Sequence, residues 1–346
     1  MLKISYCRYF LNFKETAITS RSSMNEKETF FIKIFDEQNP EIFGIGECPL
    51  FRGLSAEDTP DYEAVLRDFC KKISSGCKDV SPPNSSITFG YESAFWDLQN
   101  RTNNTFPSQD IHIPINGLIW MGDKQTMYRR ICDKLDAGFR CIKLKIGGID
   151  FEEEISLLEY IRTRFSVSDL ELRLDANGAF YPDNALDRLS RLAKYDIHSI
   201  EQPIKQHQWT DMQQIIKQSP IPIALDEELI GTWDDNSRAS LLDSLHPHYI
   251  ILKPALCGGF NSADKWIAEA EKRNIGWWAT SALESNVGLA AITLWLASHK
   301  TSMPQGLGTG ALYTNNFPSP LSVIRDEIVY HNALPPVTPS LKWLDV

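Results

Sequence analysis

Leu172-Arg173-Leu174-Asp175 is the first of three short apolar runs that each carry an acidic residue near the end. The other two are Ile200-Glu201-Gln202-Pro203 and Ile223-Ala224-Leu225-Asp226. Their acidic residues are 26 and 25 residues apart, a step that suits one strand followed by one helix. Equivalent ends of neighbouring parallel strands would bring the three carboxylates together, so the runs predict one ion site made by Asp175, Glu201 and Asp226.

Two lysines continue this spacing on either side. Lys145 lies 30 residues before the first of the acidic residues, and Lys253 lies 27 residues after the last. Because alternate residues of a strand face the same side, Lys143 and Lys145 share one face of their run, and Arg173 shares a face with Asp175. The pattern places charged groups inside or at the rim of a barrel, where branched apolar residues are usual.

The composition indicates a large globular protein. Its 346 residues exceed one ordinary domain, and 42% apolar residues are enough for a barrel-sized core and a smaller unit. The formal net charge is −10 with both signs interspersed, which argues against a nucleic-acid partner. The seven cysteines are scattered, as in reduced proteins. The sequence has no signal-peptide core and no apolar run of about 18 residues, so we expect a cytoplasmic protein without membrane insertion.

From residue 111 onward, short β-type runs alternate with helical ones, which is typical of a parallel α/β fold. We expect Asp123, Asp150, Asp183 and Asn261 to be N-caps of the intervening helices. About eight strand-helix steps can be counted, the number that closes a barrel. The expected strands are Ile113–Leu118, Cys141–Ile146, Glu171–Asp175, Ser199–Pro203, Ile221–Asp226, Tyr249–Pro254, Gly276–Thr280 and Gln305–Gly308.

The N-terminal part has a different pattern. Alternating apolar runs at Leu2–Phe10, Thr29–Phe35 and Ile42–Cys48 predict antiparallel strands, and Ala56–Ile73 and Ser86–Gln99 predict helices. We therefore expect an α+β domain at residues 1–109 and a barrel at residues 110–313. Residues 314–346 contain one more strand-like run, at residues 327–330, and are expected to return to the first domain.

The three carboxylates and the lysines predict a reaction type. Carboxylates that face one another repel unless a divalent cation neutralises them, and all-oxygen ligands suit Mg²⁺, with Mn²⁺ as a substitute. Lys145 is the expected base, because crowding by Lys143, Arg173 and the cation would lower the pKa of its amine. The cation would stabilise the negative charge that forms when a proton leaves the carbon beside a carboxylate. The expected ligand is thus a small-molecule carboxylate.

Five motifs in this chain resemble, in order and spacing, those of the enolase superfamily and its muconate-lactonizing subgroup. The resemblance covers nearly the whole chain and implies a modified (β/α) TIM-type barrel with an N-terminal α+β capping domain. It implies the metal ligands Asp175, Glu201 and Asp226, and acid/base roles for Lys145 and Lys253. Around them, Lys143, Arg173, Asn177 and Glu227 are expected to bind substrate or to support the ligands. The motifs are Lys143-Leu144-Lys145, Asp175-Ala176-Asn177-Gly178, Glu201-Gln202-Pro203, Asp226-Glu227 and Leu252-Lys253-Pro254.

Two segments bear on the substrate. The segment from Ser281 to Leu289 resembles the seventh-strand segment of the o-succinylbenzoate synthase family, and Ser281, Glu284 and Ser285 are its expected contacts to the succinyl end. The eighth-strand segment Gly306-Leu307-Gly308-Thr309-Gly310 carries no carboxylate, whereas dipeptide epimerases of the subgroup typically bind the substrate ammonium there with two aspartates. Its Gly308 and Thr309 are expected to lie at the substrate.

Two loops are expected to close over the barrel mouth. Residues 46–55 resemble a capping-domain loop of this kind, and Arg21, Ser22 and Ser23 form the second candidate.

The resemblance therefore implies a lyase of menaquinone biosynthesis that dehydrates 2-succinyl-6-hydroxy-2,4-cyclohexadiene-1-carboxylate. Lysines on both faces of the site also permit epimerisation or racemisation of a dipeptide or an N-acylamino acid. A barrel that binds a ligand without catalysis and an aldolase that forms a lysine Schiff base are further alternatives. The sequence leaves the oligomeric state open.

Overall fold

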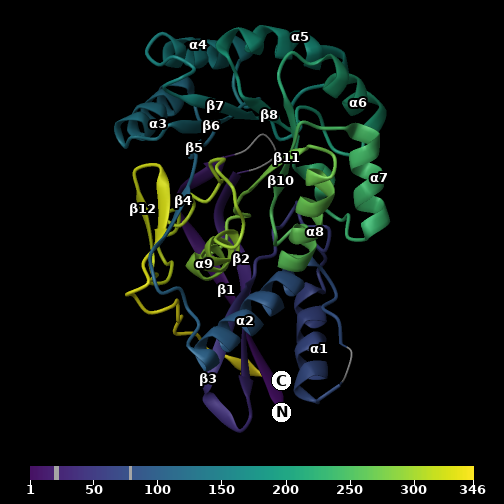
Figure 1. Ribbon diagram of the computed structural model, residues 1–346, viewed down its shortest axis with the longest axis vertical. Helices are drawn as coiled ribbons and strands as arrows, with labels where there is room; N and C mark the ends of the chain where they lie inside the picture. Colours follow the sequence, from purple (N-terminus) through teal and green to yellow (C-terminus); the bar gives the residue numbers. More distant parts are fainter. Residues whose placement is uncertain (19–22, 78–79) are drawn as a thin grey trace.

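The computed structural model describes residues 1–18, 23–77 and 80–346. Within these residues, parallel strands form a curled seven-stranded sheet (Figure 1). In chain order they are β5 (Gly117–Ile119), β6 (Cys141–Lys145), β7 (Glu171–Asp175), β8 (Ser199–Glu201), β9 (Ile223–Leu225), β10 (Tyr249–Leu252) and β11 (Gly276–Ala279). The order in the sheet is β11-β10-β9-β8-β7-β6-β5, so each strand lies next to its predecessor in the chain. This is the strand order of a (β/α) barrel, as the sequence predicts.

Helices connect the strands and cover the outside of the sheet. They bury one apolar side each; in α4, for example, Leu157, Leu158 and Ile161 belong to the same core as Leu144 and Leu174 of the strands. The helices are α3 (Lys124–Asp136), α4 (Phe151–Arg162), α5 (Pro182–Leu192), α6 (Trp209–Gln218), α7 (Asp235–Leu245), α8 (Gly259–Glu271) and α9 (Asn286–Leu296), with the short 3-10 helices η1 (Ala193–Tyr195) and η2 (Glu227–Leu229).

The expected N-caps are half right. Asp123 accepts a hydrogen bond from the Thr126 N–H, and Asp150 accepts one from the Glu152 N–H. Asp183 lies inside α5, because Pro182, whose ring fixes φ, already occupies the first helical position. Asn261 lies inside α8, which begins two residues earlier.

The two ends of the parallel sheet differ from the prediction. The expected strand Ile113–Leu118 is divided, because the chain changes partners: β4 (Ile111–Pro114) pairs antiparallel with β13 (Glu327–Tyr330), and only β5 belongs to the barrel. The expected eighth strand is reduced to two bridging residues. Gln305 bridges Ile115, and Gly306 bridges Thr280, so these residues join the two edges of the sheet and close the barrel.

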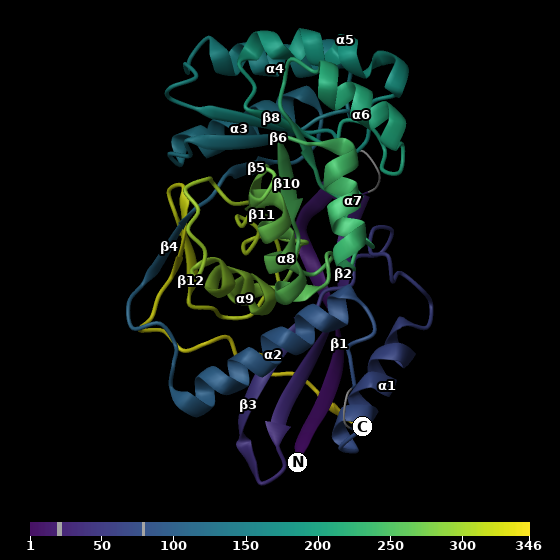
Figure 2. The same cartoon turned by 45° about the vertical axis from the view of Figure 1, so that its right-hand side comes forward.

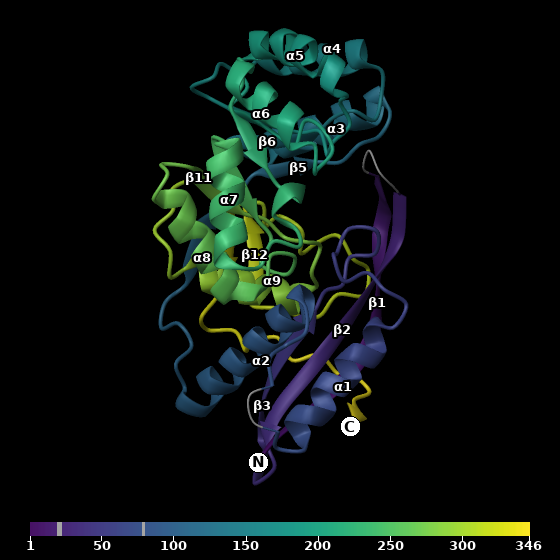
Figure 3. The ribbon, with the colours of Figure 1, turned by 90° about the vertical axis from the view of Figure 1, so that its right-hand side faces the viewer.

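The N-terminal residues form an antiparallel sheet with two helices. The strands are β1 (Leu2–Ile18), β2 (Ser23–Asp36) and β3 (Asn39–Cys48), and the helices are α1 (Tyr62–Ser74) and α2 (Ser85–Asn103). Figure 3 shows the long strands β1 and β2 running beside α1. The second loop candidate lies largely outside the described residues: Arg21 and Ser22 are not described, and Ser23 begins β2.

The C-terminal residues contact both parts of the molecule. The predicted strand at residues 327–330 is β13, which pairs with β4 and with β12 (Leu321–Ile324), while its Tyr330 packs in one apolar cluster with Phe31 and Ile45 of the N-terminal sheet. The last strand, β14 (Leu344–Asp345), pairs with β1. The predicted domain boundaries at residues 109/110 and 313/314 stay predictions.

Helix α2 lies directly on β3 because two glycines allow close approach. A Cβ atom at Gly44 would lie 1.9 Å from the Ala94 carbonyl oxygen, and one at Gly46 would lie 1.9 Å from the Gly90 oxygen. The other side of α2 meets α8 and α9 of the barrel (Figure 2). The helix thereby fixes the end of β3, and the loop that follows it, against the barrel. No helix in the described ranges is long and apolar enough to span a membrane.

Candidate active site

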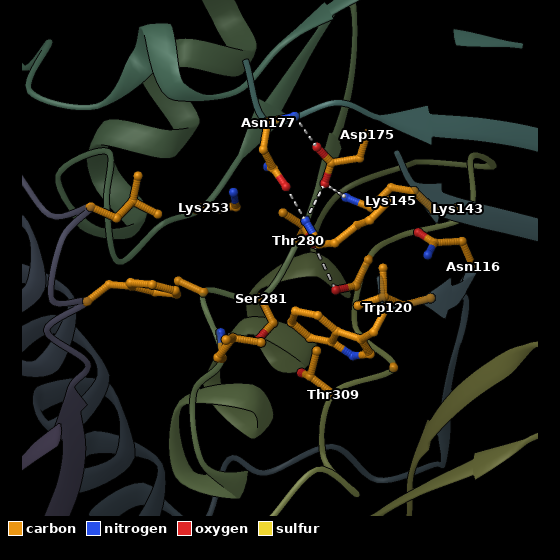
Figure 4. Close-up of a pocket in the computed structure, with 17 residues that line it drawn as sticks. Asn116, Trp120, Lys143, Lys145, Asp175, Asn177, Lys253, Thr280, Ser281 and Thr309 are labelled. Carbon is orange, nitrogen blue, oxygen red and sulfur yellow. Dashed lines mark hydrogen bonds and ion pairs between the residues drawn. The ribbon is translucent and has the colours of Figure 1, made fainter. Parts of the chain in front are cut away.

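A cavity opens at the carboxyl ends of the barrel strands, beneath the loop that follows β3 (Figure 4). Enzymes with this fold bind their substrates at this end of the barrel. Its charged lining consists of Lys143, Lys145, Asp175 and Lys253. Its other linings include the apolar Phe51, Leu54, Leu118, Trp120 and Leu283, and the uncharged polar Asn116, Asn177, Thr280, Ser281 and Thr309.

The strand register brings the predicted metal ligands to one level. Lys145 is paired with Asp175 and Asp175 with Glu201 across β6, β7 and β8. Asp226 directly follows β9, where Ala224 is paired with Glu201. All three carboxylates are buried. Lys253 directly follows β10, which lies four strands away from β6, the strand of Lys145, in the sheet order. The two lysines therefore approach the cavity from opposite sides.

Each carboxylate is paired with a lysine. Lys145 Nζ donates to Asp175 Oδ2 at 2.6 Å and to Asn177 Oδ1 at 2.7 Å, as Figure 4 shows. Lys143 Nζ lies 2.8 Å from Glu201 Oε2 and 3.4 Å from Asp175 Oδ2, so it bridges these two side chains. Lys253 pairs with Asp226. The charges therefore compensate one another, which allows them to be buried.

The pKa values show that this compensation is uneven. Burial raises the pKa of Asp175, but the adjacent Lys145 and Lys143 outweigh burial and hold this pKa well below its usual range. Burial and the negative charge of Asp175 raise the pKa of Glu201 to about 7. Burial also raises the pKa of Asp226, although Lys253 opposes the shift. Burial therefore disfavours the charged forms of Glu201 and Asp226, whereas the adjacent lysines stabilise the charged form of Asp175.

The carboxylates hold Lys143 and Lys253 in their charged forms. Burial lowers the pKa of Lys143, but the charges of Glu201 and Asp175 outweigh burial and raise it. The pKa of Lys253 is raised in the same way, with Asp226 as its main partner. The ammonium of Lys145 contacts Asp175 and Asn177, and Lys143 lies beside it, because both amines contact Asp175 Oδ2.

The site's chemistry fits a hard divalent cation. Glu201 Oε1 is buried and has no hydrogen-bond partner in the part of the chain that the structure describes. Such an oxygen requires a proton or a cation. The described residues nevertheless contain no three His, Cys, Asp or Glu side chains gathered closely enough to hold a metal ion. The reason is the lysines, because Lys143 bridges two of the carboxylates and Lys253 holds the third. The donor types suit Mg²⁺, while their spacing is set here by ammonium groups.

Three of the four predicted neighbours, Lys143, Asn177 and Glu227, join this cluster, and Arg173 lies away from it. Asn177 accepts from Lys145 and donates from Nδ2 to Glu227 Oε1 at 3.2 Å, so it connects Lys145 to the residue after Asp226. Arg173 does not line the cavity. Its guanidinium donates to Glu171 and to the Pro304 carbonyl, and lies 4.2 Å from the Trp278 ring centre, deeper in the barrel interior.

The substrate segments are placed in two layers. Ser281, Gly308 and Thr309 line the cavity, and their contact with substrate stays a prediction. Glu284 and Ser285 are fully buried behind this lining and contact other protein groups. Their predicted contact with substrate would therefore be indirect.

The sequence did not single out several cavity residues. Trp120 lies with its ring centre 5.7 Å from Lys145 Nζ, and Asn116 lies on the same chain segment. Strand parity from Leu118 could have identified both, since residues 116, 118 and 120 share one face. Phe51 and Leu54 lie within the predicted closing loop, and both line the cavity.

Comparisons with known proteins agree with this geometry. The family described as Enolase C-terminal domain-like matches residues 126–332. The o-succinylbenzoate synthase of Desulfotalea psychrophila is 43% identical to this chain, over 93% of this chain and 97% of that protein. The L-Ala-D/L-Glu epimerase of Francisella tularensis subsp. novicida is 24% identical, over 80% of this chain and 82% of that protein.

Solved structures of similar proteins have the same fold. The crystal structure of MenC from Desulfotalea psychrophila has a TM-score of 0.78 at 40% identity and covers 94% of this chain and 99% of that chain. A dipeptide epimerase from Enterococcus faecalis V583, complexed with Mg and the dipeptide L-Leu-L-Tyr, has a TM-score of 0.82 at 20% identity, over 95% of this chain and 97% of that chain. At this lower identity the likeness shows the fold alone. The chain belongs to the enolase superfamily and, within its muconate-lactonizing subgroup, to the family that contains o-succinylbenzoate synthase.

Proposed function

We propose that this protein catalyses the o-succinylbenzoate synthase reaction, the Mg²⁺-dependent syn-dehydration of 2-succinyl-6-hydroxy-2,4-cyclohexadiene-1-carboxylate to 2-succinylbenzoate in menaquinone biosynthesis. The observation that carries this proposal is the 43% identity to an o-succinylbenzoate synthase over 93% of the chain. The epimerase of Francisella tularensis subsp. novicida is far less similar, at 24% identity. We further propose a cytoplasmic enzyme that binds a small-molecule carboxylate.

Lys145 is the proposed base and acid. In its neutral form the amine takes the proton from the ring carbon that carries the carboxylate, and the electron pair is delocalised into that carboxylate as an enediolate. The bond from the ring to the hydroxyl oxygen then breaks, and Lys145 returns the proton to that oxygen, which leaves as water. The ring becomes aromatic. Because one amine performs both transfers, proton and hydroxyl leave from the same face.

Asp175, Glu201 and Asp226 are the proposed Mg²⁺ ligands. The bound cation would supply positive charge that stabilises the negative charge developing on the substrate carboxylate. Their buried position supports this assignment, as does Glu201 Oε1, which has no hydrogen-bond partner among the described residues. Mn²⁺ shares the preference for oxygen ligands and is the proposed substitute.

Lys253 is proposed to stabilise the anionic intermediate from the opposite side of the cavity. Its ammonium is held by Asp226, so it keeps its charge, and a cation above the substrate ring is favourable. The same placement supports a second candidate function, epimerisation, because Lys145 and Lys253 could each move a proton on one face of an α-carbon. The eighth-strand segment does not favour it, since the cavity-lining Gly306, Gly308 and Thr309 offer no carboxylate to a substrate ammonium.

The deciding experiment is an assay of the purified protein with the cyclohexadiene substrate, with Mg²⁺ and with a chelator. We expect 2-succinylbenzoate to form only in the presence of the cation. In parallel, dipeptides and N-acylamino acids are incubated with the protein in D₂O, and exchange of their α-protons is followed by NMR. Exchange without any dehydration would reject the proposal in favour of the epimerase.

A further inference from the structure

A carboxylate of the capping domain holds the start of a barrel helix. Glu47, at the end of β3, is fully buried, and its oxygens accept from the Ser285 N–H at 2.9 Å, from Ser285 Oγ at 2.6 Å and from the Gly288 N–H at 3.1 Å. Thr29 Oγ1 of β2 donates to the same carboxylate at 2.9 Å. Free N–H groups and a positive partial charge at the start of α9 make this a favourable place for an anion.

The same segment of chain forms one wall of the cavity. Ser281, Ala282 and Leu283 line the cavity, and only Glu284 separates them from Ser285, which Glu47 holds. Leu283 has a φ of +63°, a conformation that costs a branched residue about 1 kcal/mol or more. It is fixed at both ends, because its N–H donates to Ser281 Oγ at 2.9 Å and its carbonyl accepts from Tyr313 Oη at 2.7 Å. A strained residue held so closely at a cavity is the kind of feature that positions a ligand.

Two more buried charges lie beside this contact. Glu284 accepts from Ser281 Oγ at 2.5 Å with one oxygen, and its Oε1 has no partner among the described residues. Lys27 of β2 is buried, and its Nζ likewise has no hydrogen-bond partner in the described ranges. Both Glu47 and Glu284 are close enough to act electrostatically on Lys27. One buried lysine therefore lies with two carboxylates where the domains meet; burial lowers the pKa of Lys27, and the two carboxylates oppose that shift.

Gly288 makes this arrangement possible. A Cβ atom there would lie 2.7 Å from Glu284 Cβ and 3.0 Å from Glu47 Oε2. Without a side chain, the helix start can approach both carboxylates.

We propose that Glu47 is a positioning residue for the substrate: it acts from the capping domain, through Ser285 and Gly288, on the cavity-lining residues 281–283, with Lys27 as the counter-charge. The identity of the substrate rests on the proposed function, in which this wall faces the succinyl chain. Lys145 and Asp175 lie on β6 and β7, away from this contact. Loss of Glu47 should therefore weaken substrate binding more than it slows proton transfer.

A second interdomain carboxylate provides a matched control. Glu92 of α2 accepts from the Phe260 N–H and from Asn261 Nδ2 at the start of α8, but these two residues do not line the cavity. Glu92→Gln and Glu47→Gln each change one carboxylate at one helix start. A purely structural role predicts similar losses of stability and no selective change in kinetics.

The test compares the two variants with wild type in steady-state kinetics of dehydration and in amide hydrogen exchange. For Glu47→Gln we expect KM to rise about tenfold with kcat within about twofold, because charge-assisted bonds to the substrate wall are lost. Amide exchange of residues 281–285 should become faster. For Glu92→Gln, KM and the amide exchange of residues 281–285 should stay near their wild-type values. Equal KM values in all three proteins, or an equal rise in both variants, would overturn the proposal.

Two additions keep the test decisive. If Glu47→Gln does not fold, Thr29→Val removes one of the donors to Glu47 while keeping the shape of the side chain, and should raise KM about threefold; an unchanged KM would count against the proposal. If wild type does not dehydrate the substrate, the proposed function fails. The positioning role is then decided by amide exchange alone, where unchanged exchange of residues 281–285 in Glu47→Gln would reject it.

Discussion

At the scale of single residues, the site is a set of buried charges that compensate one another. Lys143 bridges Asp175 and Glu201, and Lys145 and Lys253 each hold one aspartate. Removing one partner would leave the other charge buried and unpaired, which costs several kcal/mol. Glu201 is the exception, since one of its oxygens has no partner among the described residues. Glu201, the second of the three proposed metal ligands in the sequence, is thus the carboxylate whose oxygens the lysines satisfy least.

Replacement of Lys145 tests its role as the base. Lys145→Ala should lower kcat for dehydration about a thousandfold, within the range for loss of a general acid-base group. Lys145→Arg keeps the positive charge beside Asp175, but a guanidinium does not give up its proton near neutral pH. We expect it to be as inactive as the alanine variant. Near-normal dehydration by Lys145→Arg would show that Lys145 acts only through its charge.

The titration of Glu201 predicts how stability depends on pH. Its pKa is about 7 in the folded protein and near its ordinary 4.5 in the unfolded chain, so the folded state binds the proton more tightly. The stability that this proton supplies is complete below about pH 4.5 and is lost as pH rises through 7, about 3 kcal/mol in total. Urea unfolding from pH 5 to 8 in chelator should show this fall.

Glu201→Gln is the control for that measurement, since an amide does not titrate and this part of the pH dependence should vanish. Mg²⁺ should stabilise wild type more at pH 8 than at pH 6, because the cation competes with the proton for the carboxylate. A metal effect independent of pH would contradict the assignment of Glu201 as a ligand.

At the scale of elements, the sequence predicted best those strands that pair with their neighbours in the chain. Strand β7 occupies the predicted residues Glu171–Asp175, because its apolar run and its acidic end both follow strand periodicity. The first and eighth strands differ because their boundaries depend on distant partners. Only the structure shows that Ile115 N–H bonds to Asp326 and that Gln305 accepts from Asn116. The predicted line of carboxylates survived because it depended on strand ends, whereas Asn116 and Trp120 were missed because they lie just outside β5 and the parity of that segment was not followed.

The barrel closure makes a prediction about two glycines. A Cβ atom at Gly306 would lie 2.1 Å from Thr280 Oγ1 and 2.7 Å from Thr280 Cβ, whereas one at Gly308 would meet nothing closer than 3.6 Å. Gly306→Ala should therefore destabilise the protein by about 1–3 kcal/mol through overpacking, and Gly308→Ala should change stability little. Urea unfolding of both variants measures the difference. Equal stabilities of the two variants would mean that Gly306 and Thr280 can move apart to make room for a methyl group.

At the scale of the whole molecule, the two domains are joined by contacts that no local pattern contains. Glu47 and Ser285 are separated by more than two hundred residues, and Glu92 and Asn261 by 169. Each member of these pairs resembles an ordinary polar residue in its own segment. A single sequence therefore predicted a capping domain and a barrel, but not how the one fixes the wall of the cavity in the other.

The C-terminal return predicts a different effect on each domain. Leu344 and Asp345 pair with β1, Ser5 Oγ donates to Asp345 at 2.7 Å, and Lys33 lies 5.6 Å from the Trp343 ring centre. Deleting residues 339–346 should lower the free energy of unfolding by about 1–2 kcal/mol, since part of an aromatic side chain and one strand edge become exposed. Amide exchange should become faster in β1 and β2 and stay unchanged in β6 to β10.

Because β3 and its loop hold Glu47, Phe51 and Leu54, KM should rise as well. If exchange instead increased in the barrel strands, residues 339–346 would support the barrel rather than the N-terminal sheet, contrary to the expected return to the first domain.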